Sequence, residues 1–86
     1  MVYPYMTLWD GTQISHTQLL DGNHVRVHFE RATETAYCFA TCELPAYTWQ
    51  NVEGFSEKDL AFLTEFAEHN AHLFYRYAQC GGVQYA

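Results

Sequence analysis

Two histidines and one glutamate in the first half of the chain have the residue types needed to bind a metal ion. His16 precedes the turn at residues 21–23, and His28 and Glu30 follow it. If the flanking strands pair so that His16 lies opposite His28, both imidazoles and the Glu30 carboxylate share one face, a set that suits a divalent transition metal. A register shifted by one residue would move His16 to the other face. Metal or small-ligand binding by these three residues is therefore the alternative hypothesis for function.

No sequence pattern favours catalysis. The chain has no Gly-x-Ser-x-Gly elbow, and no glycine-rich phosphate loop follows a predicted strand. Its three cysteines stand in no positively charged surroundings that would activate a thiolate, and we expect Cys38 and Cys42 to be buried thiols. His69 and His72 are three residues apart, which is not the spacing of a zinc-protease helix. We predict that the protein is not an enzyme and uses no cofactor.

Aromatic side chains are the other candidates for function. They make up 17% of the residues, and Tyr and Trp are enriched in protein interfaces because they combine a large contact area with a polar tip. Core packing is the competing explanation in so small a protein. The candidate interface residues are Tyr37, Phe39, Trp9, Trp49 and Tyr75.

Turn residues divide the first 51 residues into segments of strand length. The expected strands are Tyr3–Trp9, Gln13–Leu20, His24–Glu30 and Thr35–Leu44, with a short extended segment at Tyr47–Asn51. The segment Thr35–Leu44 differs from the others because Tyr37 and Phe39 make its second face apolar as well. A strand that is apolar on both faces is usually covered on both.

Residues 56–80 have the pattern of a single helix. Ser56 and Asp59 have the spacing of a capping box, and Phe55 and Leu60 that of a hydrophobic staple. Apolar residues then recur at helical spacing, and Gly81-Gly82 is expected to end the helix. Asn70 interrupts the apolar stripe, so it is the point at which the helix could bend or divide.

These elements predict an α+β fold in a single domain over residues 1–86. It consists of an antiparallel meander of about four strands, followed by a long C-terminal helix packed on one face of the sheet. One helix covers only one face. A second copy of the chain is the most economical cover for the other face of Thr35–Leu44, because most oligomers are symmetric homodimers. Chain ends folding over that face are the competing explanation.

The charge balance excludes some classes of partner. Four basic residues stand against ten acidic ones, for a net charge of −6, whereas nucleic-acid binding depends on lysine and arginine. A nucleic-acid mimic would also be acidic, but solubility explains ten dispersed acids equally well. No segment is apolar enough to span a membrane, no signal peptide is visible, and the cysteine number is odd, so we expect a cytoplasmic location. The leading hypothesis is a non-enzymatic protein-interaction module that forms a homodimer, with another protein as a further possible partner.

Overall fold

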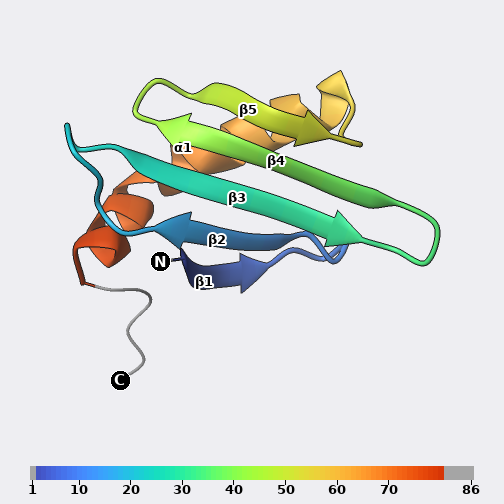
Figure 1. Cartoon of the computed structure of the whole chain (residues 1–86), viewed down its shortest axis with the longest axis horizontal. Coiled ribbons are helices and arrows are strands. Elements are labelled where there is room, and N and C mark those ends of the chain that lie inside the picture. Colours follow the sequence, from blue (N-terminus) through green and yellow to red (C-terminus); the bar gives the residue numbers. More distant parts are fainter. Residues whose placement is uncertain (1, 81–86) are drawn as a thin grey trace.

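The computed structural model describes residues 2–80, which form an antiparallel sheet followed by one helix (Figure 1). Strands adjacent in the sequence are adjacent in the sheet, so the order is β1-β2-β3-β4-β5. The elements are β1 (Val2–Thr7), β2 (Gln13–Thr17), β3 (Val25–Ala32), β4 (Tyr37–Leu44), β5 (Thr48–Glu53) and α1 (Glu57–Cys80). The predicted α+β fold, an antiparallel meander with a C-terminal helix, is confirmed.

The sheet has five strands rather than about four. The segment expected to be a short extension after residue 46 instead pairs with β4 along most of its length, with Gln50 opposite Thr41 and Trp49 opposite Cys42. As a result β4 is an interior strand with hydrogen-bonded neighbours on both sides.

Both edges of the sheet are irregular. In β1, Pro4 has no backbone N–H, and the pairing with β2 shifts register between Pro4 and Met6. In β5 the register shifts opposite the Phe39–Thr41 stretch of β4, and Asn51 has a positive φ of 54°. Irregular edges are poor templates for a further strand.

The helix begins as the sequence predicts. The Ser56 Oγ accepts a hydrogen bond from the Asp59 backbone N–H at 3.1 Å, and the Asp59 carboxylate accepts one from the Ser56 N–H at 3.0 Å. The helix is continuous through Asn70, whose side chain donates to the Phe66 carbonyl at 2.9 Å and accepts from the Tyr5 hydroxyl at 2.8 Å. Asn70 therefore connects α1 to β1 instead of interrupting the helix. The predicted stop at Gly81-Gly82 lies outside the described residues.

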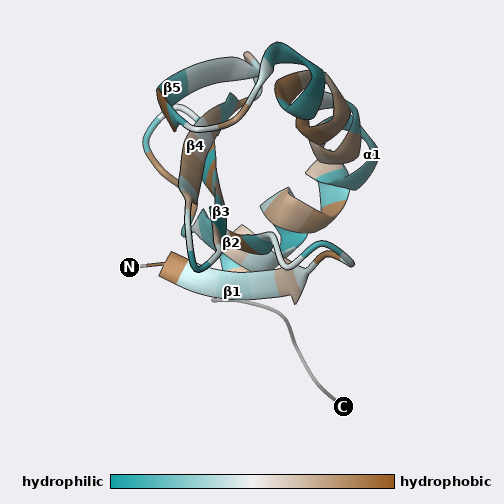
Figure 2. Cartoon of the chain, turned by 90° about the vertical axis from the view of Figure 1, so that its right-hand side faces the viewer, coloured by the Kyte–Doolittle hydropathy of each residue, from teal (hydrophilic) through white to brown (hydrophobic). Residues whose placement is uncertain are grey.

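The core lies between α1 and one face of the sheet, which curves partly around the helix (Figure 2). Its largest fully buried side chains include Phe29, Phe74, Ile14 and Leu44. Within residues 2–80, the helix does not combine the length and apolar character needed to cross a lipid bilayer.

Candidate functional site

The face of the sheet turned away from α1, here called the open face, has no element of residues 2–80 packed on it, since α1 lies on the opposite side. Across the three central strands β2, β3 and β4, one row on this face consists of Ser15, His28 and Thr41, which lie opposite one another. Pro4 of β1 extends this row, because it lies opposite Ser15. A second row contains Gln13, Glu30 and Phe39.

Three rings form a stacked series on the open face. The Tyr37 and Phe39 rings are nearly parallel, at 8°, with centroids 6.5 Å apart, and Phe39 stacks on His28 at 5.9 Å. Two hydrogen bonds hold the ends of this series: Tyr37 donates its hydroxyl proton to Glu30 at 2.8 Å, and His28 Nδ1 lies 2.9 Å from the Thr41 hydroxyl. Tyr37 is nevertheless 48% exposed. The series is therefore fixed in orientation and accessible from outside.

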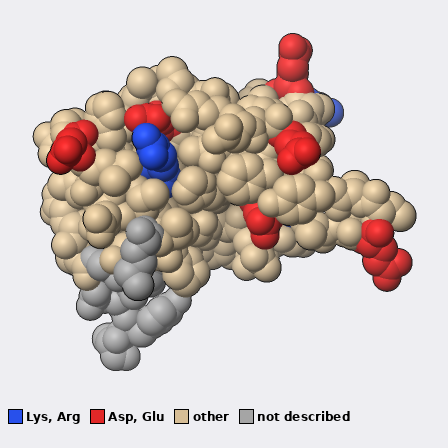
Figure 3. Space-filling view, viewed as in Figure 1, with Lys and Arg blue, Asp and Glu red and all other residues tan. Residues whose placement is uncertain are grey.

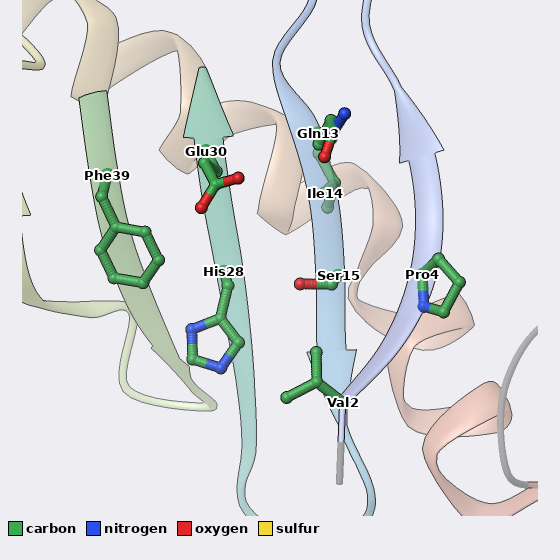
Figure 4. A pocket seen from close by; sticks show the side chains of 8 residues that line it. All are labelled: Val2, Pro4, Gln13, Ile14, Ser15, His28, Glu30 and Phe39. Carbon is green, nitrogen blue, oxygen red and sulfur yellow. The ribbon is translucent and has the colours of Figure 1, made fainter. Parts of the chain in front are cut away.

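A hollow of about 380 Å³ lies beside these rings (Figure 4). It exists because the small side chain of Ser15 stands between two larger neighbours in its row, Pro4 and His28. Its volume falls within the range of small-molecule sites, and its walls combine apolar groups with a few polar ones. The hollow is lined by Val2, Pro4, Gln13, Ile14, Ser15, His28, Glu30 and Phe39.

The electrostatics of the hollow centre on Glu30. Burial, together with the nearby positive charge of Arg26, lowers the pKa of His28, so its imidazole is neutral at neutral pH. The hydrogen bond to Glu30 raises the pKa of Tyr37, so that side chain is neutral too. Glu30 is thus the charged group among the residues lining the hollow.

At the other end of β3, Glu43 organises a polar cluster on the open face. Its carboxylate lies 3.2 Å from His24 Nδ1 and 3.7 Å from Arg26 Nε, and it accepts a hydrogen bond from Gln50 at 3.0 Å. Figure 3 shows this side of the molecule: charged atoms are few and separated, and basic and acidic atoms adjoin near one end of the visible surface.

The structure does not bring the three candidate metal ligands together. His16 lies opposite Val27 on the face beneath α1, whereas His28 and Glu30 lie on the open face. Leu20 and His24 form a bridge, and a regular ladder continued from it would place His16 opposite His28. An extra residue in the stretch between His16 and Leu20 instead shifts the register by one. The Thr17 hydroxyl accepts the Arg26 N–H at 3.1 Å in that stretch, beside the shifted pairing. Within residues 2–80 no cluster of three or more metal-binding side chains forms.

His16 is instead a core residue enclosed by aromatic rings. It is fully buried, with the rings of Tyr3, Tyr5 and Phe74 centred 5.8–6.4 Å from its own. Its Nδ1 lies 2.9 Å from the Thr17 carbonyl oxygen, so Nδ1 carries the proton and donates it, while Nε2 has no hydrogen-bond partner among the described residues.

The five candidate interface residues divide into three groups. Tyr37 and Phe39 lie together on the open face, as described above. Trp49 and Tyr75 are partly buried on the helix side: the Trp49 indole donates to the Thr64 hydroxyl at 3.0 Å, and the Tyr75 hydroxyl donates to the Asn23 carbonyl at 2.8 Å. These two side chains attach α1 to the sheet.

Trp9 stands apart from both groups. It follows β1, is 78% exposed, and meets the Phe62 ring of α1 edge to face at 5.3 Å between centroids. Trp9 is thus an exposed aromatic side chain outside the open face, which makes it a suitable control position for substitutions on that face.

Several residues of the site were not singled out from the sequence. Ser15 and Thr41 are small side chains, and Pro4 belongs to no binding or catalytic motif. The alternation of side chains along each strand indicates which residues share a face of the sheet. Whether residues of different strands lie in one row depends on the registers of three strand pairs.

Cys38 and Cys42 are buried beneath the helix, as predicted. Burial raises the pKa of the Cys42 thiol to about 11, so this thiol is protonated at neutral pH and is a poor nucleophile.

Comparison of the chain with protein-family models, with curated proteins and with solved structures gives no match.

Proposed function

We propose that this chain is a non-enzymatic protein-interaction module that self-associates through its open face. The single observation that carries the proposal is the stacked series of Tyr37, Phe39 and His28 on a sheet face that no element of residues 2–80 covers. Aromatic side chains already held in place lose little conformational entropy when they are buried by a partner.

The edges of the sheet support a face-to-face contact over strand addition. Pro4 and the register shift interrupt β1, and the shift near Asn51 interrupts β5. A second copy could not continue the ladder regularly at either edge. Of the surfaces that the sheet offers, the open face is therefore the better suited to a second copy.

Charge on the open face is self-complementary. Arg26 and Glu30 stand two residues before and after His28 on β3, about 13 Å apart in an extended strand. In a symmetric pair whose two-fold axis runs across the strands at His28, the two β3 strands are antiparallel, and Arg26 of one copy faces Glu30 of the other. The same contact is made twice, and opposite charges in facing positions favour this arrangement.

Light scattering and sedimentation across a concentration series test the proposal directly. We expect a particle of twice the 10.0 kDa chain mass to form by about 1 mM, because a contact of modest area has a Kd in the micromolar to millimolar range. Arg26→Glu and Glu30→Arg should each weaken self-association about tenfold or more by placing like charges opposite each other, and the double exchange should restore it. Trp9→Ala, which alters an exposed ring outside the open face, should leave it unchanged.

A wild-type protein that stays monomeric at that concentration contradicts the proposal. If the chain self-associates but neither single charge exchange changes its dissociation constant, the open face is not the surface through which it self-associates. Loss of the Arg26–Glu43 ion pair should not confuse the result, since the pair is long at 3.7 Å and the Arg26 side chain is half exposed, so it contributes little stability.

The hollow favours a second candidate function, the binding of a small ligand. It retains His28 and Glu30 from the alternative hypothesis, without His16, and adds apolar walls from Val2, Pro4 and Phe39. Apolar walls with a few convergent polar groups are typical of small-molecule sites.

A further inference from the structure

We infer that the hollow on the open face binds a small organic cation, namely an alkyl chain that ends in an ammonium or guanidinium group. This inference rests on the small-ligand candidate and names its ligand class. It does not require that the chain self-associates.

The first argument is the charge on Glu30. Its Oε2 accepts the Tyr37 hydroxyl at 2.8 Å, and no hydrogen bond within residues 2–80 engages its other oxygen. No lysine or arginine in that part of the chain forms an ion pair with it. Carboxylates bind ammonium and guanidinium groups through short charge-assisted hydrogen bonds. A cation at the hollow would therefore meet a carboxylate that no other cation of residues 2–80 engages.

The second argument is the ring beside that carboxylate. Phe39 lines the hollow together with Glu30, which lies opposite it in the β3–β4 register. Aromatic faces attract cations, and a planar guanidinium can also stack on a ring. His28 does not oppose a cation, because burial and Arg26 lower the pKa of its imidazole and keep it neutral at pH 7.

The third argument is the apolar wall opposite the rings. In Figure 4, Val2 and Pro4 lie across the hollow from Phe39 and His28, with Ser15 between them. An alkyl chain can therefore lie against Val2 and Pro4 while its charged end lies toward Glu30. An anionic ligand would meet Glu30 unfavourably, and a purely polar one would leave the apolar wall unused.

Arg26 of a second copy presents the same guanidinium chemistry, so the experiment must separate the two sources of cation. We would use Arg26→Gln at low concentration, which lacks that side chain, and follow backbone amide shifts by NMR. The probes are n-butylammonium and n-butylguanidinium, with n-butanol and butyrate as neutral and anionic probes of the same chain length.

We expect saturable shifts at Ser15, His28, Glu30 and Phe39 with both cations, and affinity at least about fivefold weaker for butanol and butyrate. Glu30→Gln, introduced in the same background, should weaken cation binding by about the same factor, because glutamine retains an acceptor for Tyr37 but has no charge. Trp9→Ala should not change it.

Two outcomes would overturn the inference in different ways. If butanol or butyrate binds the hollow as tightly as the cations, or if Glu30→Gln has no effect, the ligand class is wrong but the hollow remains a small-ligand site. If no probe gives saturable shifts at these residues, both the ligand class and the small-ligand candidate fail. Neither result depends on whether the wild-type chain forms dimers.

Discussion

The two faces of the sheet hold their side chains by different means. On the covered face Val27 and Phe29 of β3 are fully buried beneath α1, where apolar packing restrains them. On the open face His28 and Glu30, from the same strand, are restrained by hydrogen bonds to Thr41 and to Tyr37. One face therefore supplies most of the folding free energy, whereas the other presents ordered groups at the surface. Under the proposed function, the domain separates stability from recognition by using both faces of one sheet.

Truncating one phenylalanine to alanine on each face gives the largest expected difference in the free energy of unfolding. Phe74 is fully buried, and its ring lies 4.5 Å from that of Tyr5 between centroids. Phe74→Ala should lower the free energy of unfolding by about 3–5 kcal/mol, the usual cost of emptying a buried aromatic site. Phe39→Ala, on the open face, should cost about 1 kcal/mol or less while weakening self-association. Urea unfolding followed by circular dichroism measures the first quantity, and light scattering the second.

Phe74→Ala could unfold the chain outright, since domains of this size are only marginally stable. Phe74→Leu, which leaves a smaller cavity, then provides a measurable intermediate loss. Equal losses for the alanine variants at positions 39 and 74 would show that the open face is as important for folding as the covered one.

A polar contact on the covered side gives a smaller effect. The Tyr5 hydroxyl donates to Asn70 at 2.8 Å and attaches the edge strand β1 to the middle of α1. Tyr5→Phe should lower the free energy of unfolding by about 1 kcal/mol. Asn70→Ala should lower it by less than the loss of the Asn70 side-chain hydrogen bonds alone would, because alanine has a higher helix propensity than asparagine. A double-mutant cycle should give a coupling of about 0.5–1.5 kcal/mol between the two.

Tyr75→Phe is the matched control for that cycle, because the Tyr75 hydroxyl bonds to the Asn23 carbonyl instead. Its effect should add to that of Asn70→Ala without coupling. If Tyr5→Phe and Asn70→Ala were also additive, the hydrogen bond would contribute nothing specific to the attachment of β1.

The elements were predictable because each depends on local sequence. Ser56 and Asp59 form their capping box within one helical turn, and the alternation of Val25, Val27 and Phe29 shows which side of β3 is buried. Such signals need only neighbouring residues. They therefore located the helix start and the first four strands without knowledge of how the strands pair, whereas β5 was expected only as a short extended segment.

The site was less predictable because it depends on register. The single extra residue between His16 and Leu20 decides that His16 belongs to the core, and nothing in the residue types there distinguishes it from a regular hairpin. Trp49 and Tyr75 illustrate a second limit. Their amphipathic side chains suit an interface, yet each polar tip finds a partner within the chain, and only the tertiary structure shows this.

The smallest predicted effect concerns pH and again separates the faces. Burial and Arg26 lower the pKa of His28 in the folded chain below its ordinary value of 6.5, so the unfolded chain binds more protons as the solution becomes mildly acidic. The stability that His28 contributes is thus complete above about pH 6.5 and is lost as the pH falls through the lowered pKa. His28→Asn keeps a polar atom near Thr41 but does not titrate, so its urea midpoint should fall less than the wild-type midpoint between about pH 7.5 and about pH 5.5.

The other histidines are common to both proteins in that comparison, so the difference between the two midpoint shifts isolates His28. The carboxylates of Asp10 and Asp59 do not affect this comparison, because the pKa of each is lowered and each titrates at more acidic pH. At Asp10, hydrogen bonds from Thr12 and Arg31 outweigh the effect of burial. At Asp59, the hydrogen bond from the Ser56 backbone lowers the pKa. An equal fall in the two midpoints would mean that the His28 imidazole is as easily protonated in the fold as in the unfolded chain. The open face would then carry a positive charge beside Glu30 in mild acid, and a cation would have to compete with it for that carboxylate.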